Sequence, residues 1–393
     1  MQRIYVDNNA TTPVAPEVFE AMKPYLAGEF GNASSIHWYG QRARAAVEEA
    51  RESVARLINA QPSEIVFTSG GTESDNAALF GAADTPGRGG APHVITSAIE
   101  HHAVLYSAKA LEKRGVRVSF VPADENGVLD LSPIEGSITP ETVLVSVMHA
   151  NNELGTIQPV EEIGRIARRH GVPLHTDAVQ AAGKTPVDVK ALGASLLSLS
   201  AHKIYGPKGV GALYVRKGTP FHPLIFGGHH ERDRRGGTEN VAGIVGFGKA
   251  AELALEHGAE EARQITALRD RLERGLLKSM SGISVNGARA LRVPNTSSIS
   301  FEGVEGEGLV ISLDLAGIAC STGAACSSGS VEPSHVLSAI GLSRDKARST
   351  VRFSLGRYNS AEDVDRALDI IPRAVQRLRE LSPRNEVAEN AVL

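Results

Sequence analysis

The stretch "EIVFTSGGTESDNAALF", from Glu64 to Phe80, joins a short apolar strand, a turn with two adjacent glycines and a new helix. Further short strands follow it and alternate with helical stretches. Their sequences are "HVITSAI", "VRVSFVP", "TVLVSVMHA", "VPLHTDAV", "ASLLSLS" and "GVGALYV". This alternation predicts an α/β fold whose large domain has a mostly parallel, doubly wound sheet of seven strands.

Helical periodicity is clear over residues 41–58, 103–115 and 160–171, and the last two stretches end in glycine, as helices often do. A longer helix is predicted from about Val241 to Met280. Beyond it, the short strands "TSSISF" and "VRFSLG" mix with helices and indicate a smaller α+β domain. We place the boundary inside the long helix, near residue 260, and expect residues 382–393 to form a loose tail.

Length also favours two domains, because 393 residues exceed the size of one typical core. The predicted large domain covers residues 15–260. The small domain combines residues 1–14 with 261–393, and would carry the cysteine-containing loop and Arg352.

The composition excludes several classes of protein. The 41 basic and 45 acidic side chains nearly cancel, and no block of like charges indicates direct nucleic-acid binding. No apolar run has the length of a membrane span, and the first residues do not resemble a secretory signal. Two cysteines cannot build a disulfide framework and suit a reducing compartment. We therefore expect a cytoplasmic protein without a membrane partner.

Polar clusters follow several of the predicted strands: "TSGGT", "IEHHA", "HANNE", "TDAVQ" and "SAHK". Ligands of doubly wound sheets bind at the carboxyl ends of the strands. The sequence therefore predicts that these clusters form one site.

Lys203 and Asp177 are the central candidates of this site. Lys203 follows a buried strand, where desolvation would make its amine a nucleophile able to form a Schiff base, although a surface lysine at the start of a loop is the simpler alternative. A buried Asp177 needs a cationic partner, which the pyridine nitrogen of pyridoxal phosphate (PLP) supplies; capping a helix is the alternative. Gln180 could donate to the phenolic oxygen of the same ring.

The glycine turn could hold the phosphate of such a cofactor. Gly70 and Gly71 permit close backbone approach, and Thr72 begins a helix whose N-terminus favours an anion, although such turns are common without phosphate. Further candidate groups are Ser200 and His202 as phosphate donors, Asn152 as a neutral donor, and His101 as a ring-stacking proton shuttle or a structural hydrogen-bonding residue.

The two cysteines lie in "ACSTGAACSSGS", from Ala319 to Ser330. Two sulfurs alone supply too few ligands for a closed zinc site. Cys320 follows an apolar stretch, which predicts a small buried core residue. Cys326 stands among small residues that favour a loop, where a thiolate can react.

Nearly the whole chain resembles the PLP-dependent cysteine desulfurases of the NifS/IscS kind, within the class V aminotransferase-like enzymes of fold type I. The resemblance rests on motifs in a specific order: "VDNNATTPV", "TSGGTES", "EHHAV", "HANNELG", "TDAVQ", "SAHKIYGPKG", "RRGGTEN", "GAACSSGSVEPSHVL" and "VRFSLGR".

The resemblance implies a role for each matching residue. Lys203 would hold PLP covalently, Asp177 would bind the pyridine nitrogen, and Gln180 would lie near the ring oxygen. His101 would stack on the ring and exchange protons. The phosphate would be bound by Gly71, Thr72, Ser200 and His202, and by Thr238 of a neighbouring subunit, which implies a homodimer.

The same resemblance implies the reaction. Asn152 and Arg352 would hold the carboxylate of L-cysteine, and Lys203 would remove its Cα proton. Cys326 would then accept the sulfur as a persulfide, leaving L-alanine, and a sulfur-acceptor protein would receive it for iron–sulfur cluster, cofactor or tRNA biosynthesis. The C-terminal tail differs from the ending of members that dock on the iron–sulfur scaffold.

Two other classes of function stay open on the sequence. An aminotransferase or a selenocysteine lyase on this scaffold would turn over without needing Cys326. An inactive sulfur-relay scaffold is disfavoured, because Lys203, Asp177, His101 and Cys326 are all present.

Overall fold

The structure is a computed structural model that describes residues 3–84, 90–322 and 333–381. Its largest sheet has seven strands in the order β2-β8-β7-β6-β5-β3-β4. Their bounds are β2 Ile65–Thr68, β3 His93–Ser97, β4 Arg117–Val121, β5 Thr142–Ser146, β6 Leu174–Asp177, β7 Leu196–Ser200 and β8 Gly211–Val215. All neighbours pair in parallel except β8, which is antiparallel to both β2 and β7. The predicted doubly wound, mostly parallel sheet is confirmed.

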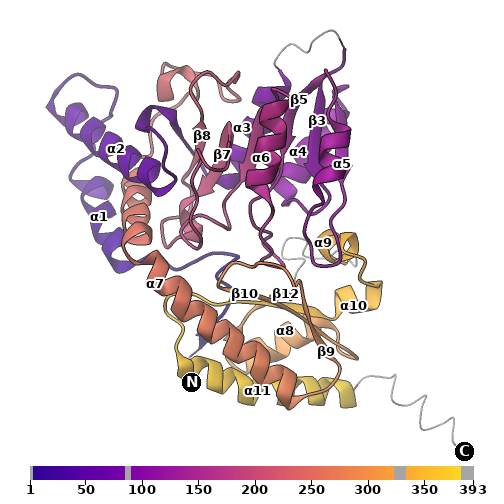
Figure 1. The fold of residues 1–393 in the computed structure, drawn as a ribbon. Coiled ribbons are helices and arrows are strands. Elements are labelled where there is room, and N and C mark those ends of the chain that lie inside the picture. Colours follow the sequence, from indigo (N-terminus) through magenta and orange to yellow (C-terminus); the bar gives the residue numbers. More distant parts are fainter. Residues whose placement is uncertain (1–2, 85–89, 323–332, 382–393) are drawn as a thin grey trace, which may run out of the picture.

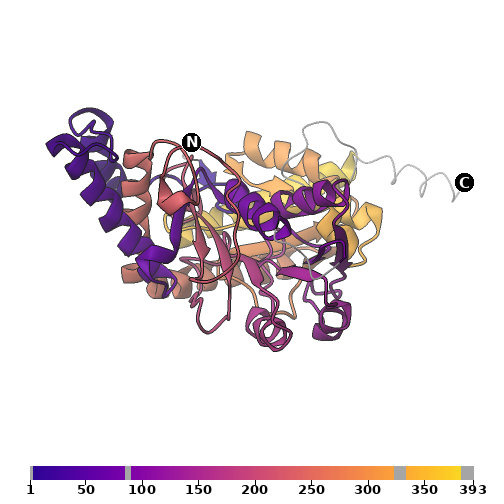
Figure 2. The same ribbon diagram turned by 90° about the horizontal axis from the view of Figure 1, so that it is seen from above.

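Helices cover both faces of this sheet (Figures 1 and 2). Successive strand residues point to opposite faces, so that Val94 packs in one core cluster and Ile95 in another. The first cluster includes residues of α3 (Gly71–Ala83) and α4 (His102–Glu112). The second includes residues of α2 (Trp38–Leu57), α5 (Leu131–Ser137) and α6 (Val160–Arg169).

One long helix, α7 (Val241–Ser279), extends from the large sheet to the smaller one (Figure 1). Its first half packs closely against α2 and α1 (Pro16–Ala27). A Cβ atom at Gly248 would lie 2.6 Å from the Cα of Ala50, so only glycine allows this approach of α7 to α2. The helix predicted for this region is confirmed to within one residue.

The smaller α+β domain is built on a four-stranded antiparallel sheet in the order β12-β13-β10-β9. The strands are β9 Ile283–Asn286, β10 Thr296–Phe301, β12 Ser321–Thr322 and β13 Thr350–Ser354. Leu276, Phe301, Phe353 and Ile371 contribute to its core. The remaining elements are β1 Ile4–Tyr5, which pairs in parallel with β11 Ile318–Ala319, α8 Gly306–Leu315, α9 His335–Ala339, α10 Arg344–Arg348, α11 Ala361–Glu380, and the short 3-10 helices η1 Pro62–Glu64, η2 Ala201–Lys203 and η3 Glu231–Asp233.

Within the part of the chain that the structure describes, no helix combines the length and the apolar character needed to cross a bilayer. The same residues contain no group of three or more His, Cys, Asp or Glu side chains placed to hold a metal ion.

Candidate active site

A cavity of about 350 Å³ lies at the carboxyl ends of β2, β3, β5, β6 and β7. It is lined by Asn9, Ala10, Gly71, Thr72, Asp75, His101, Met148, Asn152, Asp177, Val179, Gln180, Ser200, His202, Lys203 and Arg352. The fold therefore brings together the candidate residues from five strand ends and from β13. Of the predicted site residues within the described ranges, Thr238 is not among the lining residues.

Lys203 reaches this cavity from η2, the single helical turn directly after β7. Its Nζ donates to the carbonyl oxygens of Asn9, at 2.5 Å, and Ala10, at 2.7 Å. Both acceptors belong to the N-terminal segment, which contributes Asn9 and Ala10 to the cavity lining. The alternative of a surface lysine is wrong, because the amine is partly buried and held toward the cavity.

Asp177 is the last residue of β6, and its carboxylate is buried in the cavity wall. Its Oδ1 accepts a hydrogen bond from the amide of Val179 at 2.9 Å, in a turn rather than at the start of a helix. Burial raises the pKa of Asp177 to about 6, against the favourable charge of Lys203. A cationic partner beside this carboxylate would offset the cost of its burial and lower its pKa again.

The turn from β2 into α3 forms a cradle in the cavity wall beside Val179 and Ser200. A Cβ atom at Gly71 would lie 2.8 Å from Cγ2 of Val179, and Gly70 has a φ of +153°. The hydroxyl of Ser200 is buried beside this turn and has no hydrogen-bond partner within the described ranges. A helix N-terminus beside an unsatisfied buried hydroxyl fits an anion such as a phosphate.

The two predicted histidines of the cavity are both neutral at physiological pH. Burial and the charge of Lys203 lower the pKa of His101 to about 4 and that of His202 to about 4. Nδ1 of His101 accepts from the amide of Ala103 at 3.2 Å and caps α4, so its proton resides on Nε2. A ring nitrogen of His202 bonds Thr11 Oγ1 at 3.1 Å. His101 thus has a structural hydrogen bond and still lines the cavity.

Arg352 lies in the middle of β13 and is among the most buried side chains of the chain, with 2% of it exposed. It donates to Asp7 Oδ1 at 3.0 Å and to the carbonyl oxygen of Asn152 at 3.0 Å. Its Nε is buried without a partner in the described structure. The ion pair of Arg352 with Asp7 is therefore in the interior and not on the surface.

Asn9 and Asp75 also line the cavity, although the sequence analysis predicts no role for them. Asp75 faces inward from α3, one helical turn after Gly71, and its Oδ1 lies 3.6 Å from Nε2 of the buried His175. Burial, and secondarily the charge of Asp177, raise its pKa well above the usual range. Asp75 is an acidic residue on the buried side of α3, where most neighbouring buried residues are apolar. A charged residue in such a position indicates a functional role. No local signal existed for Asn9, whose neighbours come from distant segments.

Thr238 and Cys320 lie elsewhere in the structure. Thr238 is exposed in the segment between η3 and α7. Cys326 lies outside the described residues. Cys320 directly follows β11, is buried, and has a pKa raised by burial to about 12, which agrees with the small core residue predicted for it.

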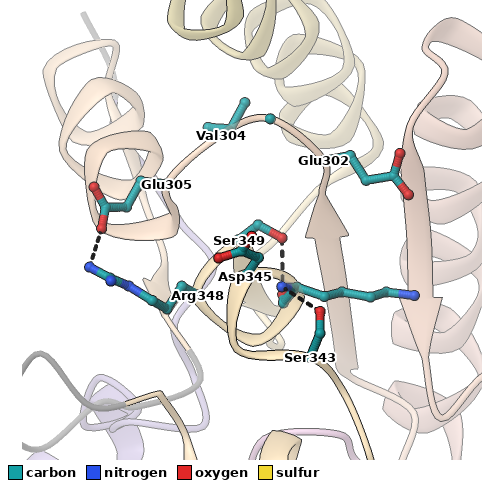
Figure 3. Close-up of a pocket in the computed structure, with 9 residues that line it drawn as sticks. Glu302, Val304, Glu305, Ser343, Asp345, Arg348 and Ser349 are labelled. Atoms are coloured by element: carbon teal, nitrogen blue, oxygen red, sulfur yellow. Dashed lines mark hydrogen bonds and ion pairs between the residues drawn. The ribbon is translucent and has the colours of Figure 1, made fainter. Parts of the chain in front are cut away.

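A second hollow, of about 460 Å³, lies on the smaller domain between the end of β10 and α10 (Figure 3). Glu305 and Arg348 form an exposed ion pair at its edge, with a distance of 2.6 Å. Its lining residues are Glu302, Gly303, Val304, Glu305, Ser343, Asp345, Lys346, Arg348 and Ser349. None of the predicted site residues is among them, so the cavity around Lys203 is the candidate active site.

A doubly wound sheet that presents a lysine amine and a buried aspartate at neighbouring strand ends, in one cavity with an anion cradle, is the arrangement of a PLP enzyme of fold type I. The family model described as "Aminotransferase class-V" matches residues 4–367. The chain belongs to this family, which uses PLP.

Similar proteins cover almost the whole chain. "Cysteine desulfurase IscS" of Dictyoglomus turgidum is 50% identical over 385 residues, which are 97% of each chain. Among solved structures, a "NifS-like protein" is 42% identical with a TM-score of 0.90, over 96% of this chain and 100% of that one. A structure described as "SspA in complex with cysteine" is 39% identical with a TM-score of 0.80, over 91% of this chain and 100% of that one.

Proposed function

We propose that this protein is a PLP-dependent cysteine desulfurase that converts L-cysteine to L-alanine and transfers the sulfur to Cys326 as a persulfide. The observation that carries the proposal is that one cavity is lined by the amine of Lys203, the carboxylate of Asp177 and the β2–α3 cradle. The family membership and the full-length similarity to cysteine desulfurases support it.

The residues of the cavity fit PLP. Lys203 would bind its aldehyde carbon covalently, Asp177 would pair with the pyridine nitrogen, and His101 would stack on the ring. Gln180 would donate to the ring oxygen, with Asn152 nearby. The phosphate would occupy the cradle, bound by Gly71, Thr72, Ser200 and His202, where the hydroxyl of Ser200 still lacks a partner among the described residues. When bound, the cofactor supplies an electron sink for the carbanion formed at the substrate Cα.

Arg352 and Asn152 would position the substrate by its carboxylate. A guanidinium binds a carboxylate through two parallel hydrogen bonds, and the unsatisfied Nε of Arg352 provides one free donor for this purpose. Asp7 already holds one Nη of Arg352 at 3.0 Å and orients the group. The buried cation therefore selects amino acids with a free α-carboxylate.

Two side chains would move protons. The amine of Lys203 would remove the proton from the substrate Cα. His101 is neutral, with a hydrogen on Nε2, and can donate that proton and take one back at the substrate.

Cys326 rather than Cys320 would accept the sulfur. Its thiolate attacks the substrate sulfur, an S–S bond forms, and the C–S bond breaks with its electron pair on carbon, which takes a proton to become alanine. Burial raises the pKa of Cys320 to about 12, so this thiol supplies almost no thiolate at neutral pH.

The division into a large domain (15–260) and a small domain (1–14 with 261–393) is part of the proposal. Separate core clusters support it, one around the large sheet and one around the four-stranded sheet. The small domain would contribute Arg352 and Cys326 to a site whose other groups lie in the large domain.

A homodimer is also part of the proposal. Phe30, Ile36, Trp38 and Tyr39, here called the 30–39 patch, are exposed, and the ring of Tyr39 contacts those of Phe30 and Trp38, with centroids 5.1 and 4.9 Å away. Contiguous exposed apolar side chains of this kind mark protein interfaces. Thr238 is likewise exposed, as it must be if it reaches the phosphate of the neighbouring subunit.

The persulfide would be passed to a sulfur-acceptor protein, an iron–sulfur scaffold or a sulfur relay protein, in the cytoplasm. Direct nucleic-acid binding is not part of the proposal, because the chain has a net charge of −4 and no basic block.

The proposal is tested by comparing Cys326→Ser with Cys320→Ser as its matched control. Cys326→Ser should bind PLP like the parent but lose alanine formation from L-cysteine by at least about a hundredfold, whereas Cys320→Ser should retain it. Turnover by Cys326→Ser at the parental rate would contradict the desulfurase mechanism and favour an aminotransferase or a lyase. Of these two, only an aminotransferase would require a keto acid.

A further inference from the structure

The side-chain amide of Gln180 is held in one orientation by contacts at both ends. Its Nε2 donates to the carbonyl oxygen of Asn9 at 3.0 Å. Its Oε1 accepts from Nζ of Lys184 at 2.6 Å. Gln180 is buried in the cavity wall, so water does not compete freely for these contacts. An amide nitrogen has two hydrogens, and the second one of Gln180 stays available to a ligand.

Lys184 lies in the turn after β6, one helical turn beyond Gln180 in sequence, and its side chain is partly buried behind the cavity. Besides Gln180, its Nζ reaches Oδ1 of Asn9 at 3.4 Å. Burial, followed by the positive charges of Lys203 and Arg352, lowers the pKa of Lys184 well below its usual range. A second amine in a site that already contains two cations is electrostatically unfavourable, and no step of the reaction described above uses it.

We propose that Lys184 is a positioning residue that fixes the amide of Gln180 so that its second N–H faces the ring oxygen of PLP. This inference rests on the proposed function and assigns a role to a residue that the proposed reaction leaves unused. Lys184 has this effect whether or not it is protonated, because both the ammonium and the neutral amine donate hydrogen bonds.

The contacts exclude the opposite orientation of the amide. After a flip, the NH₂ group of Gln180 would face the donating Nζ of Lys184, and its oxygen would face the carbonyl oxygen of Asn9. Two donors and two acceptors would then be opposed inside a buried region, where each unsatisfied group is costly. Without Lys184 only the carbonyl of Asn9 selects the orientation. The amide oxygen would then turn toward the cofactor for part of the time and repel its ring oxygen.

The experiment measures the dissociation constant of PLP for the full-length protein after cofactor removal, by fluorescence titration. Lys184→Met should weaken PLP binding by roughly tenfold, the effect expected from the loss of one buried hydrogen bond. Lys184→Arg keeps a donor and should restore most of the affinity. Lys113→Met, which removes an exposed lysine after α4, is the control and should bind like the parent.

A double-mutant cycle separates positioning from a general structural role. If Lys184 acts through Gln180, Lys184→Met should change the PLP dissociation constant by less than about twofold when Gln180 is already alanine. Equal effects of Lys184→Met in both backgrounds would overturn the proposal, since they would indicate that Lys184 only anchors the N-terminal segment through Asn9. Parental affinity of Lys184→Met would overturn it as well.

Two further results are decisive. If Lys184→Met does not fold, Lys184→Gln replaces it; this shorter, neutral side chain cannot reach Gln180 as the lysine does and should show the same loss. A parent protein that binds no PLP would contradict the proposed function itself, whereas PLP binding by the parent with no effect at position 184 would contradict only the role of Lys184.

Discussion

The buried carboxylate of Asp177 is destabilised in the protein without a ligand, and a cationic ligand would stabilise it. Its carboxylate is buried at the end of β6, and its pKa is raised to about 6 from an ordinary 3.8. The folded protein without cofactor therefore binds a proton at this group more tightly than the unfolded chain does. Its stability contribution is fully present below pH 3.8 and is lost as the pH rises through about 6.

Asp177→Asn should consequently have opposite effects on stability and on cofactor binding. In the PLP-free protein at pH 8 it should raise the free energy of unfolding by up to about 3 kcal/mol, a gain that should vanish near pH 4. It should also weaken PLP binding by at least about tenfold, since the amide cannot pair with a pyridinium.

Urea unfolding at pH 4, 6 and 8 and a PLP titration measure both effects, with the exposed Asp84→Asn as the control. A pH-independent difference in stability between Asp177→Asn and the parent would show that Asp177 does not have the raised pKa.

Among single residues, the sequence predicts those site side chains that end a strand or closely follow one. Lys203, Asp177 and Ser200 lie where they were expected, because the carboxyl ends of neighbouring strands converge at one edge of a sheet. Asn9 and Lys184 could not be predicted in this way. Their contacts to Gln180 depend on the path of the N-terminal segment and on the shape of a turn, neither of which leaves a periodic pattern.

Among the elements, the segment around η3 is anchored by a buried ion pair. Glu231 accepts from Arg51 at 2.7 and 2.8 Å and from the amide of Phe67 at 2.8 Å. Glu231, Arg232 and Asp233 all have a positive φ, a conformation that is unfavourable for these residues. The pair thus stabilises a strained segment that leads toward Thr238.

Glu231→Ala should remove two buried hydrogen bonds to the charged Arg51 and leave it paired only with Glu48, at 3.2 Å, and should lower the free energy of unfolding by about 3 kcal/mol. Arg165→Ala, which removes the exposed pair with Glu161, is the matched control and should cost less than about 1 kcal/mol. Chemical denaturation measures both. Adding Arg51→Met to Glu231→Ala should recover part of the loss, and a loss of less than 1 kcal/mol in Glu231→Ala would contradict the anchoring role.

The alternation of strands and helices predicted the elements well, but not the direction of β8. All five residues of β8 are buried, so its sequence is apolar throughout and resembles that of a central parallel strand. The positive φ values at residues 231–233 could not be predicted from the sequence either, because Glu and Arg rarely adopt such values.

The whole molecule is connected by long-range contacts of the N-terminal segment. β1 pairs with β11 near the other end of the chain, and Asn9 bonds both Thr296 and the carbonyl of Asn152. The two sheets and the site between them therefore depend on a segment whose location no local pattern indicates. The assignment of residues 1–14 to the small domain stays a prediction, which the pairing of β1 with β11 supports.

At this scale the proposed dimer predicts the behaviour of the 30–39 patch. Ile36 is 92% exposed, and Ile36→Glu should convert the dimer to a monomer, because a charge cannot be buried there without a partner. Leu315→Glu is the control, at a leucine that is 83% exposed at the end of α8. Sedimentation velocity measures the oligomeric state, and a dimer that persists in Ile36→Glu would contradict the proposed interface.

The most direct test of the desulfurase mechanism locates the sulfur itself. The purified protein is incubated with L-cysteine, thiols are blocked, and the peptides are examined by mass spectrometry. We expect one or more added sulfur atoms on the peptide that contains Cys326 and none on Cys320, together with the release of alanine. Added sulfur on Cys320, or alanine formation without any sulfur on Cys326, would contradict it.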